Sequence, residues 1–162
     1  MQWLACLGPT TCPFCALSHG KIFSIDEDIF PCPPVHDRCA CSIISLKALL
    51  AGTATNNGKS GADWILKHTG RLPGYYISKE DAENLGWIPI LGNLSSVAPG
   101  KMIGGEQFKN RQGRLPQAEG RIWYEADINY TSLWRNDDRI LFSNDGLIFV
   151  TYDHYMTFIE II

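Results

Sequence analysis

The chain has 162 residues, with 14 Lys and Arg against 17 Asp and Glu, and its formal net charge at pH 7 is -3. This length suits one domain, or one domain with a small appendage. No apolar run approaches the roughly 20 residues that span a bilayer, so we expect no membrane-spanning helix in this sequence. The acidic balance is not typical of nucleic-acid-binding proteins, and any such function would need a local cluster of positive charge.

Cysteine is distributed unevenly along the chain. This distribution indicates that the chain has two parts, each held together by different forces. We predict a Cys/His-rich segment over residues 1–50 and a second domain over residues 62–162. Residues 51–61 between them are small and polar, which is typical of a linker. The six cysteines all lie in the first part, at Cys6, Cys12, Cys15, Cys32, Cys39 and Cys41.

The Cys/His spacing in the first part is compatible with zinc. Short paired spacings of Cys and His can supply four tetrahedral ligands in a unit without a large core. Free thiols without a metal and disulfides are the two alternatives. The first residues lack the basic region of a signal peptide, which counts against disulfides. The simplest ligand set is Cys12, Cys15, His36 and Cys39, with Cys41 as a substitute.

The remaining chain predicts short helices followed by strands. Residues 42–51 carry an apolar stripe of helical spacing, and the later helices are expected at 62–69, 79–85 and 93–99. Ser78 followed by Asp81 has the spacing of a helix cap. This order predicts an α+β fold in which short helices pack on a multi-stranded antiparallel β-sheet. The strands are expected at 102–108, 122–128, 139–143, 147–152 and 155–161.

Two acids and two arginines stand out around the second of these strands. Glu125 and Asp127 are two residues apart and therefore share a face of the sheet. Two carboxylates are costly to bury unless cations lie opposite, and Arg135 and Arg139 are the nearest candidates. We interpret Asp127 as their structural counter-charge.

From about Trp64 to its end, over about 100 residues, the chain resembles the barnase-like family of microbial ribonucleases. The resemblance runs through LPGYYISKEDAENLGW, GNLSSVAPGKMIGGEQFKNRQGRLP, GRIWYEADINYTSLWRNDDRILFSNDGLI and DHYMTF. It implies the microbial ribonuclease fold. It also implies a metal-independent endoribonuclease that cleaves single-stranded RNA through a 2′,3′-cyclic phosphate, without a catalytic cofactor.

The resemblance also assigns catalytic roles. RNA cleavage needs a base for the ribose 2′-OH, an acid for the departing 5′-oxygen and fixed cations for the phosphoryl oxygens. The resemblance implies that Glu125 is the base and His154 the acid. It places Arg135, Arg139 and Lys79 around the phosphate. From local sequence alone, His154 at a turn would be interpreted as a surface residue, and Lys79 as a solvated one.

Base recognition in the family comes from a loop that matches residues 108–113. Gln112 stands where the family has an acidic residue that accepts protons from guanine. An amide offers one acceptor, and its NH₂ group would face a donor, so guanine preference is not expected to carry over unchanged. Glu106 stands where the family has Asp, and we interpret it as structural support. The residues assigned to substrate binding are Phe108, Asn110, Arg111, Gln112 and Tyr155, whose ring could stack on a base.

The resemblances also suggest partners and a route of delivery. The cations around the phosphate are what an acidic barstar-like inhibitor would cover. CPFCALSHGKIF and PPVHDRCAC resemble, over about 35 residues, the C-terminal end of Mu F-type phage minor head proteins. This implies a toxin that is associated with phage head proteins in a virion or delivered into a target-cell cytoplasm, without a signal peptide. Secretion by another route is the alternative.

A second hypothesis comes from a different class of protein. The chain could be a virion structural or interaction protein that carries an inactive ribonuclease fold. The intact set of Glu125, His154, Arg135 and Arg139 speaks against this hypothesis, because a decayed site should have lost at least one of them.

Overall fold

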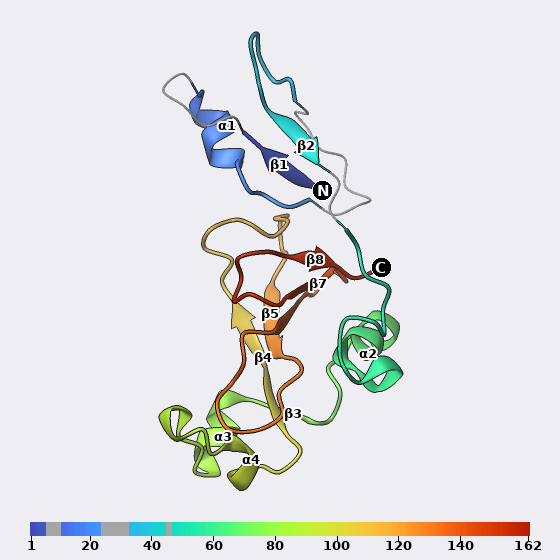
Figure 1. The fold of residues 1–162 in the computed structure, drawn as a ribbon, viewed down its shortest axis with the longest axis vertical. Coiled ribbons are helices and arrows are strands. Elements are labelled where there is room, and N and C mark those ends of the chain that lie inside the picture. The colour runs from blue at the N-terminus through green and yellow to red at the C-terminus, as the bar shows by residue number, and fades with distance from the viewer. Residues whose placement is uncertain (6–10, 24–32, 45–46) are drawn as a thin grey trace. The chain divides into compact units, whose positions relative to one another are not determined.

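A computed structural model of the chain describes residues 1–5, 11–23, 33–44 and 47–162. The chain divides into two compact units. The first, here called the N-terminal unit, is formed by Met1–Lys47 together with Asn110–Glu119. The second, the sheet unit, is formed by Ala48–Lys109 together with Gly120–Ile162. Figure 1 draws the elements of both units along the colour-coded chain. Among the helices in the described ranges, none is long and apolar enough to cross a membrane.

The sheet unit is built on six strands in the order β3-β4-β5-β6-β7-β8. Neighbours from β4 to β8 pair antiparallel, whereas the short β3 joins β4 in parallel. Two strands have the predicted bounds, and the prediction of an α+β fold is confirmed. The strands are β3 (Tyr76–Ile77), β4 (Met102–Phe108), β5 (Trp123–Asp127), β6 (Arg139–Ser143), β7 (Ile148–Thr151) and β8 (Ile159–Glu160).

The helices of the sheet unit lie before its long strands, as the sequence predicts. Helix α2 packs against β6 and β7, and α3 packs against β4. Ser78 caps α3 by accepting a hydrogen bond from the Asp81 N–H at 3.0 Å, which satisfies one of the free donors at a helix start. The helices are α2 (Ala62–Thr69), α3 (Lys79–Asn84) and α4 (Leu94–Val97), with 3₁₀ turns η1 (Gly58–Ser60) and η2 (Pro89–Leu91).

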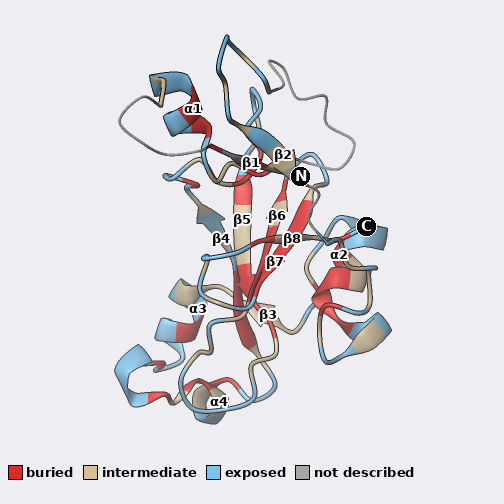
Figure 2. Ribbon diagram, turned by 45° about the horizontal axis from the view of Figure 1, so that its top comes forward, coloured by how far each residue is buried: buried red, intermediate tan, exposed pale blue. Residues whose placement is uncertain are grey.

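The core of the sheet unit runs along the central strands. Ala126, Ile140 and Val150 from β5, β6 and β7 cluster with Leu66 of α2 and with Ile161. Figure 2 shows these strands largely in the colour of buried residues. Their burial fixes the register of the sheet, because a slip of one residue would turn the apolar side chains outward. The two acids of β5, Glu125 and Asp127, are therefore carried by a rigid sheet.

Residues 51–61, which the composition predicts to be a linker, make ordered contacts in the sheet unit. Asp63, fully buried on α2, accepts hydrogen bonds from the Gly52 N–H at 2.7 Å and the Ala54 N–H at 2.9 Å. Thr55 Oγ1 donates to the other oxygen of the same carboxylate at 2.9 Å. The segment therefore folds against the start of α2. The division of the chain at residues 50 and 61 stays a prediction.

The N-terminal unit contains one small sheet and one short helix. β1 (Gln2–Leu4) pairs antiparallel with β2 (Ser42–Ile44), and α1 spans Pro13–Ser18. The predicted helix over 42–51 is wrong throughout its described part. Residues 42–44 form β2, which pairs with β1, and residues 47–51 contain no helix, with Leu49 bridged to Ile161. Pairing with another strand overrides the local apolar stripe. Residues 45–46 of that prediction, and Cys6 and Cys32, lie outside the described residues.

Candidate active site

Glu125 lies at the centre of β5 with 15% of its side chain exposed. Tyr155 Oη donates a hydrogen bond to Glu125 Oε2 at 2.7 Å, and Lys79 Nζ lies 3.8 Å from Oε1. Burial, together with the hydrogen bond and charge of Glu125, raises the pKa of Tyr155 well above its usual value. The phenol therefore stays protonated near neutral pH and remains a donor to the carboxylate.

Lys79 is held by the first turn of α3. Its backbone N–H donates to Glu106 Oε1 at 2.9 Å, which ties the start of α3 to strand β4. A carboxylate at the start of a helix also compensates the positive end of the backbone dipoles. Glu106 thus fixes the point from which the Lys79 side chain reaches Glu125. This contact agrees with the supporting role expected for Glu106.

Asp127 occupies a different environment from Glu125, although both lie on β5. Its side chain is fully buried, and two arginines meet it there. Arg135 donates to both of its oxygens, at 2.7 Å from Nε and 2.6 Å from Nη2. Arg139 Nε lies 3.1 Å from Oδ1, and the Arg139 side chain is only 5% exposed. Burial opposes the charge of Arg135, but the hydrogen bonds and charge of Asp127 outweigh it and raise the pKa of the guanidinium.

His154 lies in the tight turn between β7 and β8. Both His154 and Tyr155 have left-handed backbone, with φ of 54° and 69°, which is uncommon for residues other than glycine and is often found at functional sites. His154 Nδ1 lies 3.0 Å from Asp137 Oδ1, and its side chain is 63% exposed. A carboxylate at Nδ1 leaves Nε2 open to solvent.

Asp153 holds this turn together. Its side chain accepts hydrogen bonds from Thr151 Oγ1 at 2.8 Å, from the Thr157 N–H at 2.8 Å and from Thr157 Oγ1 at 2.6 Å. Thr151 Oγ1 in turn accepts from the Tyr155 N–H at 2.9 Å. β8 begins later than predicted because these bonds fold residues 153–157 into a turn. Sequence reasoning missed this role, although Asp and Thr around a turn are a recognised signal.

Phe108 and Tyr155 stack on each other at the end of β4. Their ring centroids are 5.4 Å apart and the planes meet at 19°. Two of the residues assigned to substrate binding therefore touch within the sheet unit. The hydroxyl of Tyr155 also reaches the carboxylate of Glu125. Tyr155 therefore contacts both the Phe108 ring, assigned to substrate binding, and the predicted general base. The sequence predicts a stacking role for Tyr155 but does not indicate this hydrogen bond.

The loop residues that follow Phe108 belong to the N-terminal unit. Asn110 is buried, has a left-handed φ of 40° and exchanges two hydrogen bonds with the backbone of Leu115, at 2.9 and 3.2 Å. These bonds close a turn in which Arg111 and Gln112 are exposed. Asn110 thus shapes the loop, and the two exposed side chains are available to a ligand.

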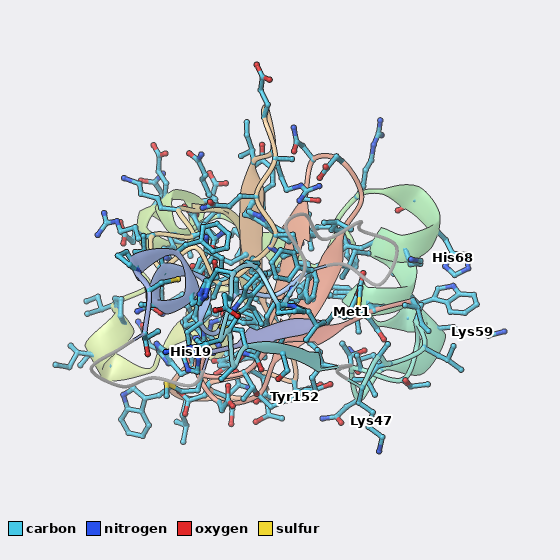
Figure 3. All side chains as sticks on the ribbon, turned by 90° about the horizontal axis from the view of Figure 1, so that it is seen from above. Met1, His19, Lys47, Lys59, His68 and Tyr152 are labelled. Atoms are coloured by element: carbon cyan, nitrogen blue, oxygen red, sulfur yellow. The ribbon has the colours of Figure 1, made fainter. Side chains whose placement is uncertain are left out.

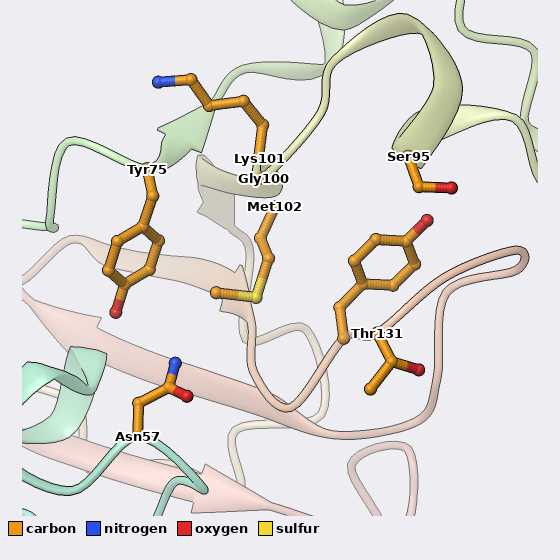
Figure 4. A pocket seen from close by; sticks show the side chains of 8 residues that line it. Asn57, Tyr75, Ser95, Gly100, Lys101, Met102 and Thr131 are labelled. Carbon is orange, nitrogen blue, oxygen red and sulfur yellow. The ribbon is translucent and has the colours of Figure 1, made fainter.

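A separate cavity lies in the sheet unit, and Figure 4 shows it from close by. Its volume is about 250 Å³. None of the residues predicted to act in catalysis lines it. The lining residues are Asn57, Tyr75, Ser95, Gly100, Lys101, Met102, Tyr130 and Thr131.

The predicted metal ligands come together in the N-terminal unit. Donor atoms of Cys12, Cys15 and His36 lie within 4.8 Å of one another, and so do those of Cys15, Cys39 and Cys41. Cys15 belongs to both groups and is 1% exposed. The chemistry of this donor set, thiols with one imidazole, fits a metal such as zinc.

The fold and the site of the sheet unit define a class of protein. Acid–base cleavage of a phosphodiester needs a base, an acid and fixed cations. The sheet unit contains groups of these kinds: a partly buried carboxylate held by Tyr155 and Lys79, a histidine next to that tyrosine, and a cluster of arginines. These features on an α+β sheet are those of an endoribonuclease.

Comparison with known proteins leads to the same class. The ribonuclease family profile matches residues 59–162. A ribonuclease of Heyndrickxia coagulans is 56% identical over 100 residues, which cover 62% of this chain and 91% of that protein. Ribonucleases of Bacillus intermedius and Bacillus pumilus are also 56% identical over 100 residues, and the match spans 61% of each. The chain belongs to the ribonuclease family.

Proposed function

We propose that the chain cleaves single-stranded RNA by transesterification, with Glu125 as general base and His154 as general acid. The observation that carries this proposal is the environment of Glu125 between Tyr155 and Lys79. The hydrogen bond from Tyr155 and the ion pair with Lys79 hold this carboxylate in one position. A charged carboxylate is the form that can remove the proton from the ribose 2′-OH.

His154 supplies the second proton transfer. Asp137 accepts from a protonated Nδ1, which holds the ring and leaves Nε2 to give a proton to the departing 5′-oxygen. The P–O bond to that oxygen breaks while the 2′-oxygen bonds to phosphorus, and the product is a 2′,3′-cyclic phosphate. In its later hydrolysis the two residues exchange roles: His154 takes a proton from water, and Glu125 returns one to the 2′-oxygen.

Fixed cations support the same reaction. Negative charge grows on the phosphoryl oxygens, and guanidinium groups can meet two of these oxygens at once. Asp127 fixes Arg135 and Arg139 in place, so they need little reorganisation during the reaction. Lys79 adds a third cation next to the base. Side chains thus supply both proton transfers and the charge compensation, and we propose that catalysis needs no metal.

Base preference is the point at which this chain departs from its family. Gln112 is exposed on its loop and offers a guanine one amide oxygen as acceptor. Without charge assistance, the discrimination between guanine and other bases should be weaker than with a carboxylate. We propose a ribonuclease with relaxed base preference.

A toxin role, delivery with phage head proteins and control by an acidic barstar-like inhibitor are further parts of this proposal. They rest on the sequence resemblances, and the cations at Lys79, Arg135 and Arg139 are the groups that an acidic inhibitor would meet. Expression of the wild-type chain should stop growth of a host cell. Co-expression of a barstar-like protein should restore growth, and growth that remains inhibited would contradict the proposed inhibitor.

The reaction is tested with a pair of matched substrates. The wild-type chain is incubated in EDTA with an RNA oligonucleotide and with the same oligonucleotide carrying a single 2′-deoxyribose at the main cleavage position. We expect cleavage of the first with a 2′,3′-cyclic phosphate in the product mass, and protection of the modified bond in the second. Cleavage of the deoxy bond, or a requirement for added metal, would contradict the mechanism.

A further inference from the structure

The N-terminal unit contains a cluster of thiols and one imidazole that the ribonuclease reaction does not use. We propose that this cluster is a structural zinc site with Cys12, Cys15, His36 and Cys39 as ligands. The site would hold α1 to the turn at residues 36–39, and it is independent of the acid–base residues of the sheet unit.

Two distances from Cys15 to other donor atoms match the edges of a zinc tetrahedron. Zn–S bonds of about 2.3 Å and Zn–N bonds of about 2.0 Å at tetrahedral angles place two sulfurs about 3.8 Å apart, and a sulfur and a nitrogen about 3.5 Å apart. In the structure, Cys15 Sγ lies 3.9 Å from Cys39 Sγ and 3.4 Å from His36 Nε2. Cys12 completes a compact group with Cys15 and His36. Cys15 therefore already lies at tetrahedral spacing from His36 and from Cys39, and it links the two groups of donors.

The ring of His36 is oriented as in a metal ligand. Its Nδ1 lies 2.8 Å from the backbone carbonyl oxygen of Asp37. A carbonyl only accepts hydrogen bonds, so Nδ1 carries the proton and Nε2 keeps its lone pair in the neutral ring. Nε2 is the atom that faces the thiols. Zinc-bound histidines almost always donate their other N–H to such an acceptor, which fixes the tautomer.

The backbone near Cys12 also favours a bound thiolate. Cys12 is the N-cap of α1, and its Sγ accepts a hydrogen bond from the Cys15 N–H at 3.3 Å. Pro13 between them has its φ fixed in the range that a helix start requires. A hydrogen bond to sulfur compensates part of the negative charge that a thiolate brings to the site. The turn thus holds two ligands in place before any metal binds.

The N-terminal unit has a physical need for such a link. Among its described residues, one buried apolar cluster consists of Trp3, Ala5 and Cys15, with cysteines prominent among the partly buried residues around it, and Ile22 and Leu115 are also buried. So small a core supplies little hydrophobic stabilisation, and units of this size commonly depend on a metal or on disulfides. The four cysteines of the cluster are free thiols, which leaves them available to a metal.

Cys41 is the alternative ligand, and the structure gives a reason to place it second. Cys41 groups with Cys15 and Cys39, and neither Cys39 nor Cys41 belongs to the group of Cys12, Cys15 and His36. Cys39 is placed first because its backbone N–H donates to the His36 carbonyl oxygen at 3.1 Å, which closes the turn that carries both residues. Using Cys41 in place of Cys12 would leave the preformed N–H···S turn at Cys12 without a role. We therefore assign Cys41 to the surroundings of the site.

The experiment begins with the full wild-type chain. The protein is purified under reducing conditions with Zn²⁺ present, dialysed against metal-free buffer, and analysed for metal and for free thiols. We expect about one zinc per chain and protection of three thiols from alkylation, which is lost when a strong chelator removes the zinc. Less than a tenth of a zinc per chain, or a mass loss that reveals a disulfide among these cysteines, would overturn the proposal.

Variants then identify the ligands. Cys12→Ser, Cys39→Ser and His36→Ala should each weaken zinc binding by more than about 100-fold, whereas Cys41→Ser and the matched control His19→Ala should keep about one zinc. Binding of Co²⁺ to the wild type should give the absorption bands of a tetrahedral thiolate site, and His36→Ala should alter them. Zinc loss in Cys41→Ser with retention in Cys12→Ser would overturn the ligand set.

A folding control accompanies every variant. The sheet unit carries the proposed acid–base residues Glu125 and His154, so RNA cleavage by a variant shows that this unit is folded while metal content is compared. Wild-type protein from which zinc has been removed should also retain cleavage at neutral pH and lose thermal stability in the N-terminal unit. Unchanged melting after zinc removal would contradict a structural role for the metal.

Discussion

The Tyr155 hydroxyl donates a hydrogen bond to Glu125 at 2.7 Å while the Tyr155 ring stacks on Phe108. One side chain therefore joins the proposed general base to a pair of aromatic rings that we propose as a nucleobase-binding surface. The two contacts use different parts of the residue and can be separated by mutation.

Tyr155→Phe removes the hydroxyl and keeps the ring. A hydrogen bond to a charged group contributes about 1.5–3 kcal/mol, so we expect kcat to fall about 10-fold or more while KM changes less than about 2-fold. Tyr155→Ala should lower kcat and also raise KM. Steady-state kinetics on a short RNA measures both.

The matched control is Tyr152→Phe. It removes a hydroxyl that donates to the Ala54 carbonyl oxygen at 2.7 Å and has no contact with the catalytic residues in the described structure. Its kcat should stay within about 2-fold of wild type. A wild-type kcat in Tyr155→Phe would contradict a role for the hydroxyl in positioning Glu125.

Asp127→Asn tests the buried counter-charge. The substitution leaves Arg139, 5% exposed, next to a neutral group, and breaking one side of a buried ion pair costs about 3–5 kcal/mol. The control Asp145→Asn breaks the pair with Arg121, in which the Asp145 side chain is 44% exposed, and should cost less than about 1 kcal/mol. Urea denaturation measures the free energy of unfolding of both variants. Equal losses would show that Asp127 is not the structural centre of this cluster.

The turn that carries His154 should respond to acid through Asp153. Burial acts to raise the pKa of Asp153, but hydrogen bonds from Thr157 and Thr151 outweigh it and hold that pKa below its usual value. A carboxyl whose pKa is lowered by folding stabilises the protein above its unfolded pKa of about 3.9, and this contribution is lost as pH falls through the lower folded pKa. The free energy of unfolding should therefore decrease below about pH 4.

Asp153→Asn should make that decrease shallower and cost about 1 kcal/mol at pH 7, where the carboxylate bonds are lost. Glu83→Gln, which neutralises an exposed carboxylate on α3, is the matched control and should follow the wild-type curve. Thermal melts between pH 2.5 and 7 provide the measurement. An Asp153→Asn curve parallel to that of the wild type would refute the assignment.

Gln112→Glu tests base preference. The carboxylate would restore two charge-assisted acceptors for the guanine N1 and N2 protons, and a well-formed pair of this kind discriminates by about 1–3 kcal/mol. Cleavage mapping on a mixed-sequence RNA should show a shift toward guanine of about 10-fold or more. Gln117→Glu adds the same charge nearby and should leave the map unchanged. An equal shift in both variants would mean that charge, and not the position of residue 112, sets the preference.

The elements that local sequence determines were predicted well. β4 and β6 have the predicted bounds, and the Ser78 cap starts α3 where its spacing indicates. Residues 42–44 were predicted wrongly as helix, since pairing with β1 overrides a local apolar stripe. Strand β8 was predicted too long because the hydrogen bonds of Asp153 were not anticipated.

Contacts between distant residues could not be predicted in the same way. The hydrogen bond from Tyr155 to Glu125 joins residues 30 apart in the chain and depends on the pairing of β5, β6 and β7. Asp137 as the partner of His154 depends on the same pairing. Sequence resemblance named the catalytic residues, whereas the structure supplied the groups that hold them. The assignment of their roles stays a prediction.

Single-turnover cleavage of a short RNA by matched histidine variants tests the central claim most directly. His68 stacks on Trp64 and projects away from the ribbon, as does nearby Lys59 (Figure 3). The control His68→Ala therefore removes an imidazole that has no role in the proposed mechanism. We predict that His154→Ala and Glu125→Ala each lower the rate by about 100-fold or more, while His68→Ala cleaves at the wild-type rate. Wild-type cleavage by folded His154→Ala or Glu125→Ala would contradict the account.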